Sequence, residues 1–149
     1  MLGPFLVFAL AVAFTVAGVI GCGVGPARME SIVTYGDGER TFEGVIVVPR
    51  READKKRPAI VIAHDFLGLG DYQKAVAHRL ADKGYVVLAA DIYGQGVRPK
   101  SNDEANRLAL SLRGDVPTMR RRMMAAYQLL TSQPGVDSSK VVALGYSIG

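Results

Sequence analysis

The residues with the clearest chemical meaning close the printed sequence, where Gly145, Tyr146, Ser147, Ile148 and Gly149 fit the pattern G-x-S-x-G. In this pattern a serine occupies a sharp turn between a buried strand and a helix, with its hydroxyl above the end of a sheet. The segment KVVAL directly before it has the composition of a buried strand. The two glycines stand where a tight turn leaves little room for side chains. The pattern predicts that Ser147 is a nucleophile.

A serine hydroxyl needs a general base, because its own pKa is far above neutral. In proteins with this pattern, an acidic residue and then a histidine follow the serine along the chain. The two histidines, His64 and His78, both precede Ser147 and are poor candidates for the base. We therefore expect the sequence to be the N-terminal part of an enzyme, holding the nucleophile but not its acid and base, and inactive alone.

The elements that must position Ser147 alternate between strands and helices. Segments 31–36 and 40–49 are rich in β-branched residues and flank the turn signal GDGE, which predicts a hairpin. Short apolar strands are predicted at 59–64, 85–91 and 140–145, and helices at 70–84, 101–114 and 115–135. This order predicts an α/β fold, a mostly parallel sheet with right-handed crossovers and helices on both faces.

The helix predicted at 70–84 carries specific expectations. Asp71 is its predicted N-cap. Tyr72, Val76, Leu80 and Lys83 fall on one helical stripe, with Lys83 at its polar end, and this stripe predicts the face that packs on the sheet.

The N-terminal segment has a different character from the rest of the chain. Residues 1–23 carry no charged side chain and are long enough to cross a bilayer. The sequence Val19-Ile20-Gly21-Cys22 resembles a bacterial lipobox, which would make Cys22 a lipidated N-terminus, although no Lys or Arg precedes the apolar run. An uncleaved transmembrane anchor and a cleaved secretory signal are the alternatives.

All three interpretations place the folded part outside the cytoplasm or at the membrane. A lipid or an N-terminal helix would hold it at the cell envelope, whereas a cleaved signal would lead to secretion. The sequence then divides into a signal peptide or anchor at 1–22, a linker at 23–30 and one domain at 31–149.

Composition excludes several classes of protein. The chain is 49% hydrophobic and 21% charged, which is typical of a globular domain. Cys22 is the only cysteine, so neither a disulfide framework nor a zinc cluster is expected. The basic residues are scattered except at 120–122, which argues against a nucleic-acid partner. No phosphate-binding loop occurs, and GLGDYQ lacks the third glycine of a dinucleotide site, so no metal or cofactor is expected.

Two longer stretches carry a family resemblance. PAIVIAHDFLGLGDYQKAVAHRLADKGYVVLAADIYG, followed by VVALGYSIG, resembles the dienelactone hydrolase family of α/β-hydrolases, from about Ser31 to Gly149. The resemblance implies an α/β-hydrolase fold that stops after the nucleophile strand. It also implies that Ser147 is the nucleophile, that the backbone N–H groups of Phe66 and Ile148 form the oxyanion hole, and that Asp65 is an acidic neighbour of the nucleophile.

Two departures from the family pattern broaden the expected substrate. The best-known members carry cysteine where this chain has Ser147, and usually glutamate where it has Asp65. The expected substrate is therefore a small-molecule ester or lactone rather than a dienelactone. The alternative is a non-catalytic envelope lipoprotein or a ligand-binding pseudoenzyme with the same fold. In this architecture strand 140–145 is central and is flanked by further strands. A fragment that stops at Gly149 would leave this strand at an open edge, so we also expect Val141, Val142 and Leu144 to be less covered than apolar residues normally are.

Overall fold

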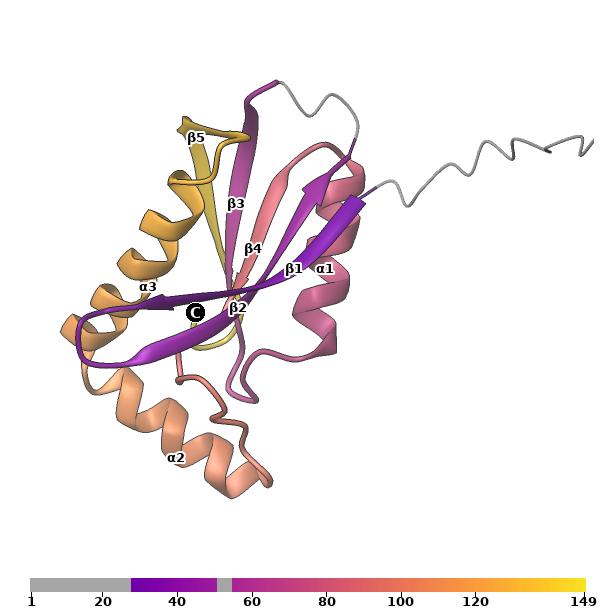
Figure 1. Cartoon of the computed structure of the whole chain (residues 1–149). Helices are drawn as coiled ribbons and strands as arrows, with labels where there is room; N and C mark the ends of the chain where they lie inside the picture. The colour runs from indigo at the N-terminus through magenta and orange to yellow at the C-terminus, as the bar shows by residue number, and fades with distance from the viewer. Residues whose placement is uncertain (1–27, 51–54) are drawn as a thin grey trace, which may run out of the picture.

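A computed structural model describes residues 28–50 and 55–149 (Figure 1). The strands are β1 (Arg28–Gly36), β2 (Thr41–Pro49), β3 (Arg57–Ala63), β4 (Val86–Ala90) and β5 (Val136–Gly145). The helices are α1 (Asp71–Asp82), α2 (Asn102–Arg113) and α3 (Val116–Thr131). The predicted order of strands and helices is confirmed.

The five strands form one sheet in the order β1-β2-β4-β3-β5. β2 is antiparallel to both β1 and β4, whereas β3 is parallel to both β4 and β5. Four strands therefore run in one direction, as the prediction of a mostly parallel sheet requires. Ala63 pairs with Ala90 on one side and with Gly145 on the other, so β3, β4 and β5 end at the same edge. Ligands of open α/β sheets bind outside this carboxyl edge.

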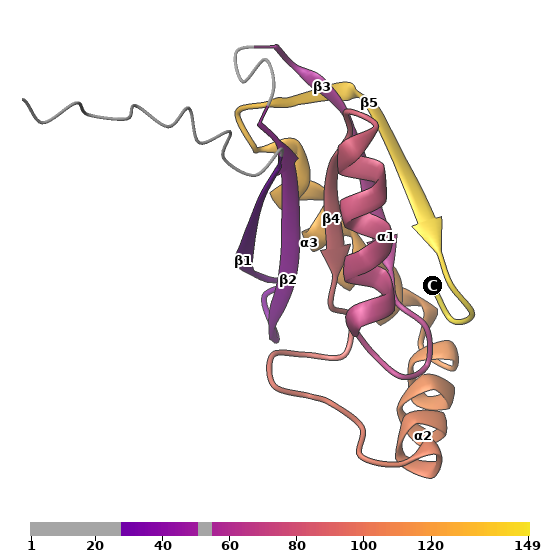
Figure 2. The same cartoon turned by 90° about the vertical axis from the view of Figure 1, so that its right-hand side faces the viewer.

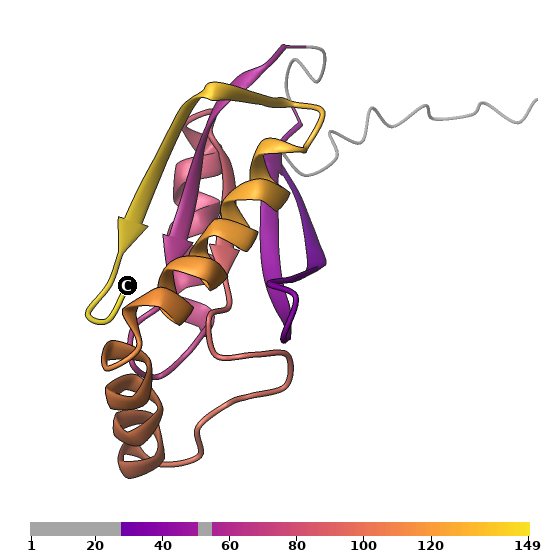
Figure 3. The ribbon, with the colours of Figure 1, turned by 90° about the vertical axis from the view of Figure 1, so that its left-hand side faces the viewer.

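Helices cover the two faces of the sheet. α1 lies on one face (Figure 2) and α3 on the other (Figure 3). Neighbouring strand residues alternate between the two cores, because successive side chains of a strand point to opposite faces. Thus Val61 and Leu88 pack in the core with α3, while Ile62 and Val87 pack in the core with α1. Burial on both faces explains why these strands read as continuous apolar runs.

The helix α2 stands apart from both faces. It lies beyond the carboxyl edge of the sheet, at the same end of the molecule as the final residues of the chain (Figure 1). Its buried residues are Ala105, Ala109 and Leu112, and Ser101 caps it by accepting a hydrogen bond from the Glu104 N–H at 3.2 Å. This position lets α2 form a wall beside the loops that leave the sheet.

Three details differ from the sequence-based expectations. β1 begins at Arg28, because its pairing with β2 continues to Pro49. The N-cap of α1 is Gly70 rather than Asp71, and its N–H donates to the Gln73 side chain at 3.2 Å. The predicted stripe of α1 is partly wrong: Tyr72 is exposed, and Gln73, Val76, Ala77 and Ala81 form the buried face.

β5 lies at one edge of the sheet in the described part of the chain. Val142 is 60% exposed, and Val141 and Leu144 are only partly buried. The expectation that these apolar residues are poorly covered is confirmed.

The N-terminal predictions fall on residues 1–27, outside the described residues, and so does Cys22. Among the helices that are described, none has the length and apolar character needed to cross a bilayer.

Candidate active site

Ser147 sits in the turn that directly follows β5. Its φ angle is 56°, which makes Ser147 the only non-glycine residue with a positive φ among the described residues. This left-handed conformation costs energy for a residue with a Cβ atom, and such strain clusters at functional sites. The side chain of Ser147 is exposed at the carboxyl edge of the sheet.

The two glycines of the pattern are required by close backbone contacts. A Cβ atom on Gly145 would overlap the carbonyl oxygen of Gly149, and one on Gly149 would lie 2.5 Å from the Ala63 Cβ. The turn is closed by a hydrogen bond from the Gly149 N–H to the Tyr146 carbonyl at 3.0 Å. The sequence pattern therefore corresponds to a real strained turn.

The two predicted oxyanion-hole residues lie together with the predicted nucleophile. Phe66, Ser147 and Ile148 line one cavity of about 170 Å³. Neither the Phe66 N–H nor the Ile148 N–H donates a hydrogen bond to any residue of the described chain. Free amide donors near a nucleophile are what a developing oxyanion requires. Ile148 itself is buried beside Ile92 and Tyr93, which anchors the turn.

The opposite wall of this cavity comes from α2. Asn106, Ala109, Leu110 and Arg113 line it. The helix was predictable from the sequence, but its place beside Ser147 was not. Amphipathic spacing indicates which face of a helix is apolar, and it does not indicate which loop that helix lies against. The available signal was that Asn106 and Arg113, two polar residues two helical turns apart, lie on the same face of the helix.

Asp65 is held within its own loop. One carboxylate oxygen accepts from the Leu67 N–H at 2.8 Å, and the other accepts from the Gln73 Nε2 at 3.0 Å. Gln73 is 2% exposed, so this contact is shielded from water. No hydrogen bond joins Asp65 to Ser147 in the described part of the chain. The structure therefore places Asp65 as an anchor of the loop that carries Phe66.

The two histidines are both occupied elsewhere. His64 is fully buried, and its Nε2 accepts a hydrogen bond from the Ile92 N–H at 3.1 Å. Its Nδ1 must then carry the proton and donate to the Asp65 carbonyl at 2.6 Å. His78 contacts Glu30 at 2.5 Å and accepts from the Arg28 Nε at 2.7 Å, both from β1. Neither ring contacts Ser147.

Tyr93 and Asp91 follow β4 and organise the same edge. The Tyr93 hydroxyl donates to the Phe66 carbonyl at 2.9 Å. Burial and the negative charge of Asp65 raise the pKa of Tyr93 to about 12, so its hydroxyl keeps its proton. Asp91 is fully buried and accepts from the Tyr93 N–H at 2.9 Å. Burial raises the pKa of Asp91, but the hydrogen-bond partners of its carboxylate, the Tyr93 and Gly94 amides among them, outweigh burial and leave the pKa below its usual range.

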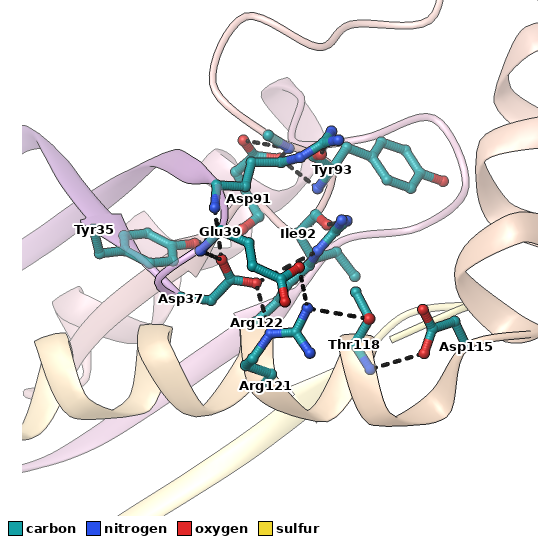
Figure 4. A network of polar contacts seen from close by, with 12 residues as sticks. Tyr35, Asp37, Glu39, Asp91, Ile92, Tyr93, Asp115, Thr118, Arg121 and Arg122 are labelled. Carbon is teal, nitrogen blue, oxygen red and sulfur yellow. Dashed lines mark hydrogen bonds and ion pairs between the residues drawn. The ribbon is translucent and has the colours of Figure 1, made fainter.

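An ionic network ties the β1–β2 turn to α3 (Figure 4). Arg121 pairs with Asp37 at 3.3 Å and with Glu39 at 2.7 Å. Arg122 donates to the Ile92 carbonyl at 2.7 Å and is mostly buried. Two of the three arginines at 120–122 therefore take part in contacts that hold α3 against the β1–β2 turn and the end of β4.

Two other features of the described residues concern metal binding and a second cavity. No group of three or more His, Cys, Asp or Glu side chains is arranged to hold a metal ion in this part of the chain. A larger groove of about 540 Å³ lies between α3 and the β1–β2 turn and is lined by Asp37, Arg120 and Met124 among others. It shares no lining residue with the Ser147 cavity.

Comparisons with known proteins agree with this arrangement. The chain is 33% identical over 86 residues to YghX of Escherichia coli (strain K12), a protein named as a hydrolase fragment, and the match covers 56% of this chain and 73% of YghX. The solved structure of m3DLH is 31% identical, with a TM-score of 0.79. A dienelactone hydrolase-like promiscuous phosphotriesterase from metagenomic libraries is 35% identical, with a TM-score of 0.77.

Each of these two structural matches covers 83% of this chain and 51% of the solved protein, so the chain spans about half of their length. The sequence profile of the dienelactone hydrolase family matches residues 42–149, from β2 through the serine turn. The fold, the strained serine and the family profile lead to one conclusion: the chain belongs to the dienelactone hydrolase family.

Proposed function

We propose that the protein hydrolyses a small-molecule ester or lactone with Ser147 as its nucleophile. One observation carries this proposal: a serine in a strained turn lines the same cavity as Phe66 and Ile148, whose amide N–H groups have no acceptor in the described chain. A turn that served only to connect two elements would not need a strained serine next to free donors.

The proposed reaction follows from this geometry. The Ser147 oxygen attacks the carbonyl carbon, and the carbonyl oxygen becomes an oxyanion that accepts hydrogen bonds from the Phe66 and Ile148 N–H groups. The C–O bond then breaks, and the alcohol leaves or, for a lactone, stays attached to the opened acyl chain. Water hydrolyses the acyl–serine ester and frees Ser147.

The proton of Ser147 must go to a base, and both histidines of the described chain have their ring nitrogens engaged. We therefore propose that an acidic residue and a histidine beyond residue 149 complete the site in the whole protein, and that the 149-residue chain alone is inactive. Loss of these partners typically leaves activity several orders of magnitude below that of the intact enzyme.

The proposal is tested by hydrolysis of p-nitrophenyl acetate and butyrate with the complete gene product. Ser147→Ala should lower kcat by at least about a thousandfold. Ser139→Ala is the matched control, since Ser139 is an exposed serine at the other end of the same strand, where its hydroxyl donates to Asp137. Equal activity of both variants would contradict the proposal, and a folded wild-type protein without turnover would favour a ligand-binding pseudoenzyme.

The location of the protein is a separate proposal. We propose attachment to the cell envelope through a lipid on Cys22, supported by the apolar run and the lipobox-like sequence before it. Intact mass of the membrane fraction should show loss of residues 1–21 and a gain of diacylglycerol mass. An intact N-terminus would instead favour a transmembrane anchor, and a soluble cleaved product would favour secretion.

A further inference from the structure

The donor attributed to Phe66 depends on the orientation of two peptide bonds, one on each side of that residue. The peptide plane between Asp65 and Phe66 carries the Asp65 carbonyl and the Phe66 N–H, which point in opposite directions because the bond is trans. The next plane carries the Phe66 carbonyl and the Leu67 N–H. Rotation of the first plane would turn the Phe66 N–H, and movement of the second would displace the Phe66 Cα that the two planes share.

The first plane is held through its carbonyl. The Asp65 carbonyl accepts from the His64 Nδ1–H at 2.6 Å and from the Gly68 N–H at 3.1 Å. His64 is itself fixed, because its Nε2 accepts from the Ile92 N–H of the neighbouring strand end at 3.1 Å. The buried ring thus connects the end of β4 to the carbonyl opposite the proposed oxyanion donor.

The second plane is held at both of its ends. The Phe66 carbonyl accepts from the Tyr93 hydroxyl at 2.9 Å, and the Leu67 N–H donates to the Asp65 carboxylate at 2.8 Å. The rings of His64 and Tyr93 also contact each other edge to face, with centroids 4.6 Å apart. Tyr93 is 2% exposed, so its hydrogen bond competes little with water.

We propose that His64 and Tyr93 are positioning residues that clamp the two peptide planes around Phe66 and so keep its N–H directed at the oxyanion. Neither side chain touches the reacting atoms. This inference rests on the proposed function, because a positioned oxyanion donor matters only if an oxyanion forms. It assigns a purpose to a fully buried histidine that the proposed reaction does not use as a base.

Tyr93→Phe is the most informative variant, because it removes one hydroxyl and keeps the ring. Loss of a whole oxyanion donor costs about 10²–10³ in kcat, and a loosened donor should cost less. We expect kcat to fall about tenfold while KM changes by less than about twofold. Val136→Ala is the control for general stability, since Val136 is buried in the core with α3, at the opposite end of β5 from Ser147.

The control separates positioning from general stability. Both Tyr93→Phe and Val136→Ala should lower the thermal stability, but Val136→Ala should keep the wild-type kcat. A second pair examines His64: His64→Gln retains a donor and an acceptor and should keep more activity than His64→Leu. The inference is overturned if Tyr93→Phe keeps full kcat, or if Val136→Ala loses as much kcat as Tyr93→Phe.

Hydrogen exchange supplies a readout that needs no turnover. The Leu67 and Gly68 amides, which are bonded within the clamped loop, should exchange about tenfold faster in Tyr93→Phe than in the wild type. Their exchange should stay at the wild-type rate in Val136→Ala. If the wild-type protein shows no Ser147-dependent turnover, the proposed function fails, and exchange still decides whether the clamp exists. Equal exchange in all three proteins would disprove the clamp.

Discussion

At the scale of single residues, the site depends on polar groups that point to backbone rather than to substrate. The loop after β3 is fixed by Asp65 and Gln73, and the loop after β4 by Asp91, whose carboxylate accepts from the Tyr93 and Gly94 amides. Buried carboxylates with several N–H partners stabilise a single loop conformation, because an unpaired buried charge would cost several kcal/mol. The loops around Ser147 are therefore held in place by polar side chains that bond to the loops themselves.

Asp91 makes this dependence measurable as a function of pH. Its pKa in the folded protein lies below the ordinary value of about 4, so the unfolded chain takes up the proton first as pH falls. The stabilisation from Asp91 is therefore complete above about pH 4 and disappears as pH falls through the lower folded pKa. The free energy of unfolding, measured by urea titration from pH 2 to pH 6, should rise with pH less steeply in Asp91→Asn than in the wild type. Parallel curves would refute the assignment.

The fold around these residues was largely predictable, but the internal contacts of the site were not. Ser147 was found because its pattern includes glycines that only a tight turn demands. Gln73 was missed because a polar residue on a buried helix face gives no periodic signal, and the small residues Ala77 and Ala81 beside it give a weak one. The contact predicted between Asp65 and the nucleophile stays a prediction.

At the scale of elements, α2 is the most informative piece of the structure. It covers neither face of the sheet and supplies the wall of the Ser147 cavity through Asn106, Leu110 and Arg113. Sequence signals gave its ends well, since Ser101 and Glu104 have capping spacing and Gly114 follows its last turn. The loops that α2 lies against could not be predicted from the sequence, because they depend on where the strands end in space.

The cap of α2 gives a direct test of how far this wall is held by the helix itself. Ser101→Ala removes the side-chain acceptor for the Glu104 N–H and should lower the free energy of unfolding by about 1 kcal/mol. Ser111→Ala is the matched control, because Ser111 is exposed inside the same helix, where alanine is the more favourable residue. Chemical denaturation of both variants measures the difference. Equal stability of the two variants would show that the cap contributes little.

At the scale of the whole molecule, the sheet exposes an apolar edge at β5. Val142 is 60% exposed on a strand whose outer side has no strand partner in the described chain. The matched part of this chain covers only 51% of the two solved relatives, and we propose that in the whole protein further structure covers this edge. Exposed apolar edges otherwise pair with other chains and aggregate.

Residues 28–149 expressed alone should therefore associate through β5. Val142→Lys places a charge on the exposed edge and should reduce association in analytical ultracentrifugation, with little effect on thermal unfolding. Val47→Lys, at a fully buried position of β2, should instead unfold the domain, which shows that the benefit belongs to the edge rather than to added charge. A monomeric wild-type segment would contradict this account of β5.

The central claim is that Ser147 is a nucleophile beside two free amide donors. The most direct measurement treats the complete gene product with a fluorophosphonate and maps the adduct by peptide mass spectrometry. The account predicts one adduct on the peptide that contains Ser147, retained in Ser139→Ala and absent from Ser147→Ala. An adduct on another residue, or labelling that persists in Ser147→Ala, would contradict it.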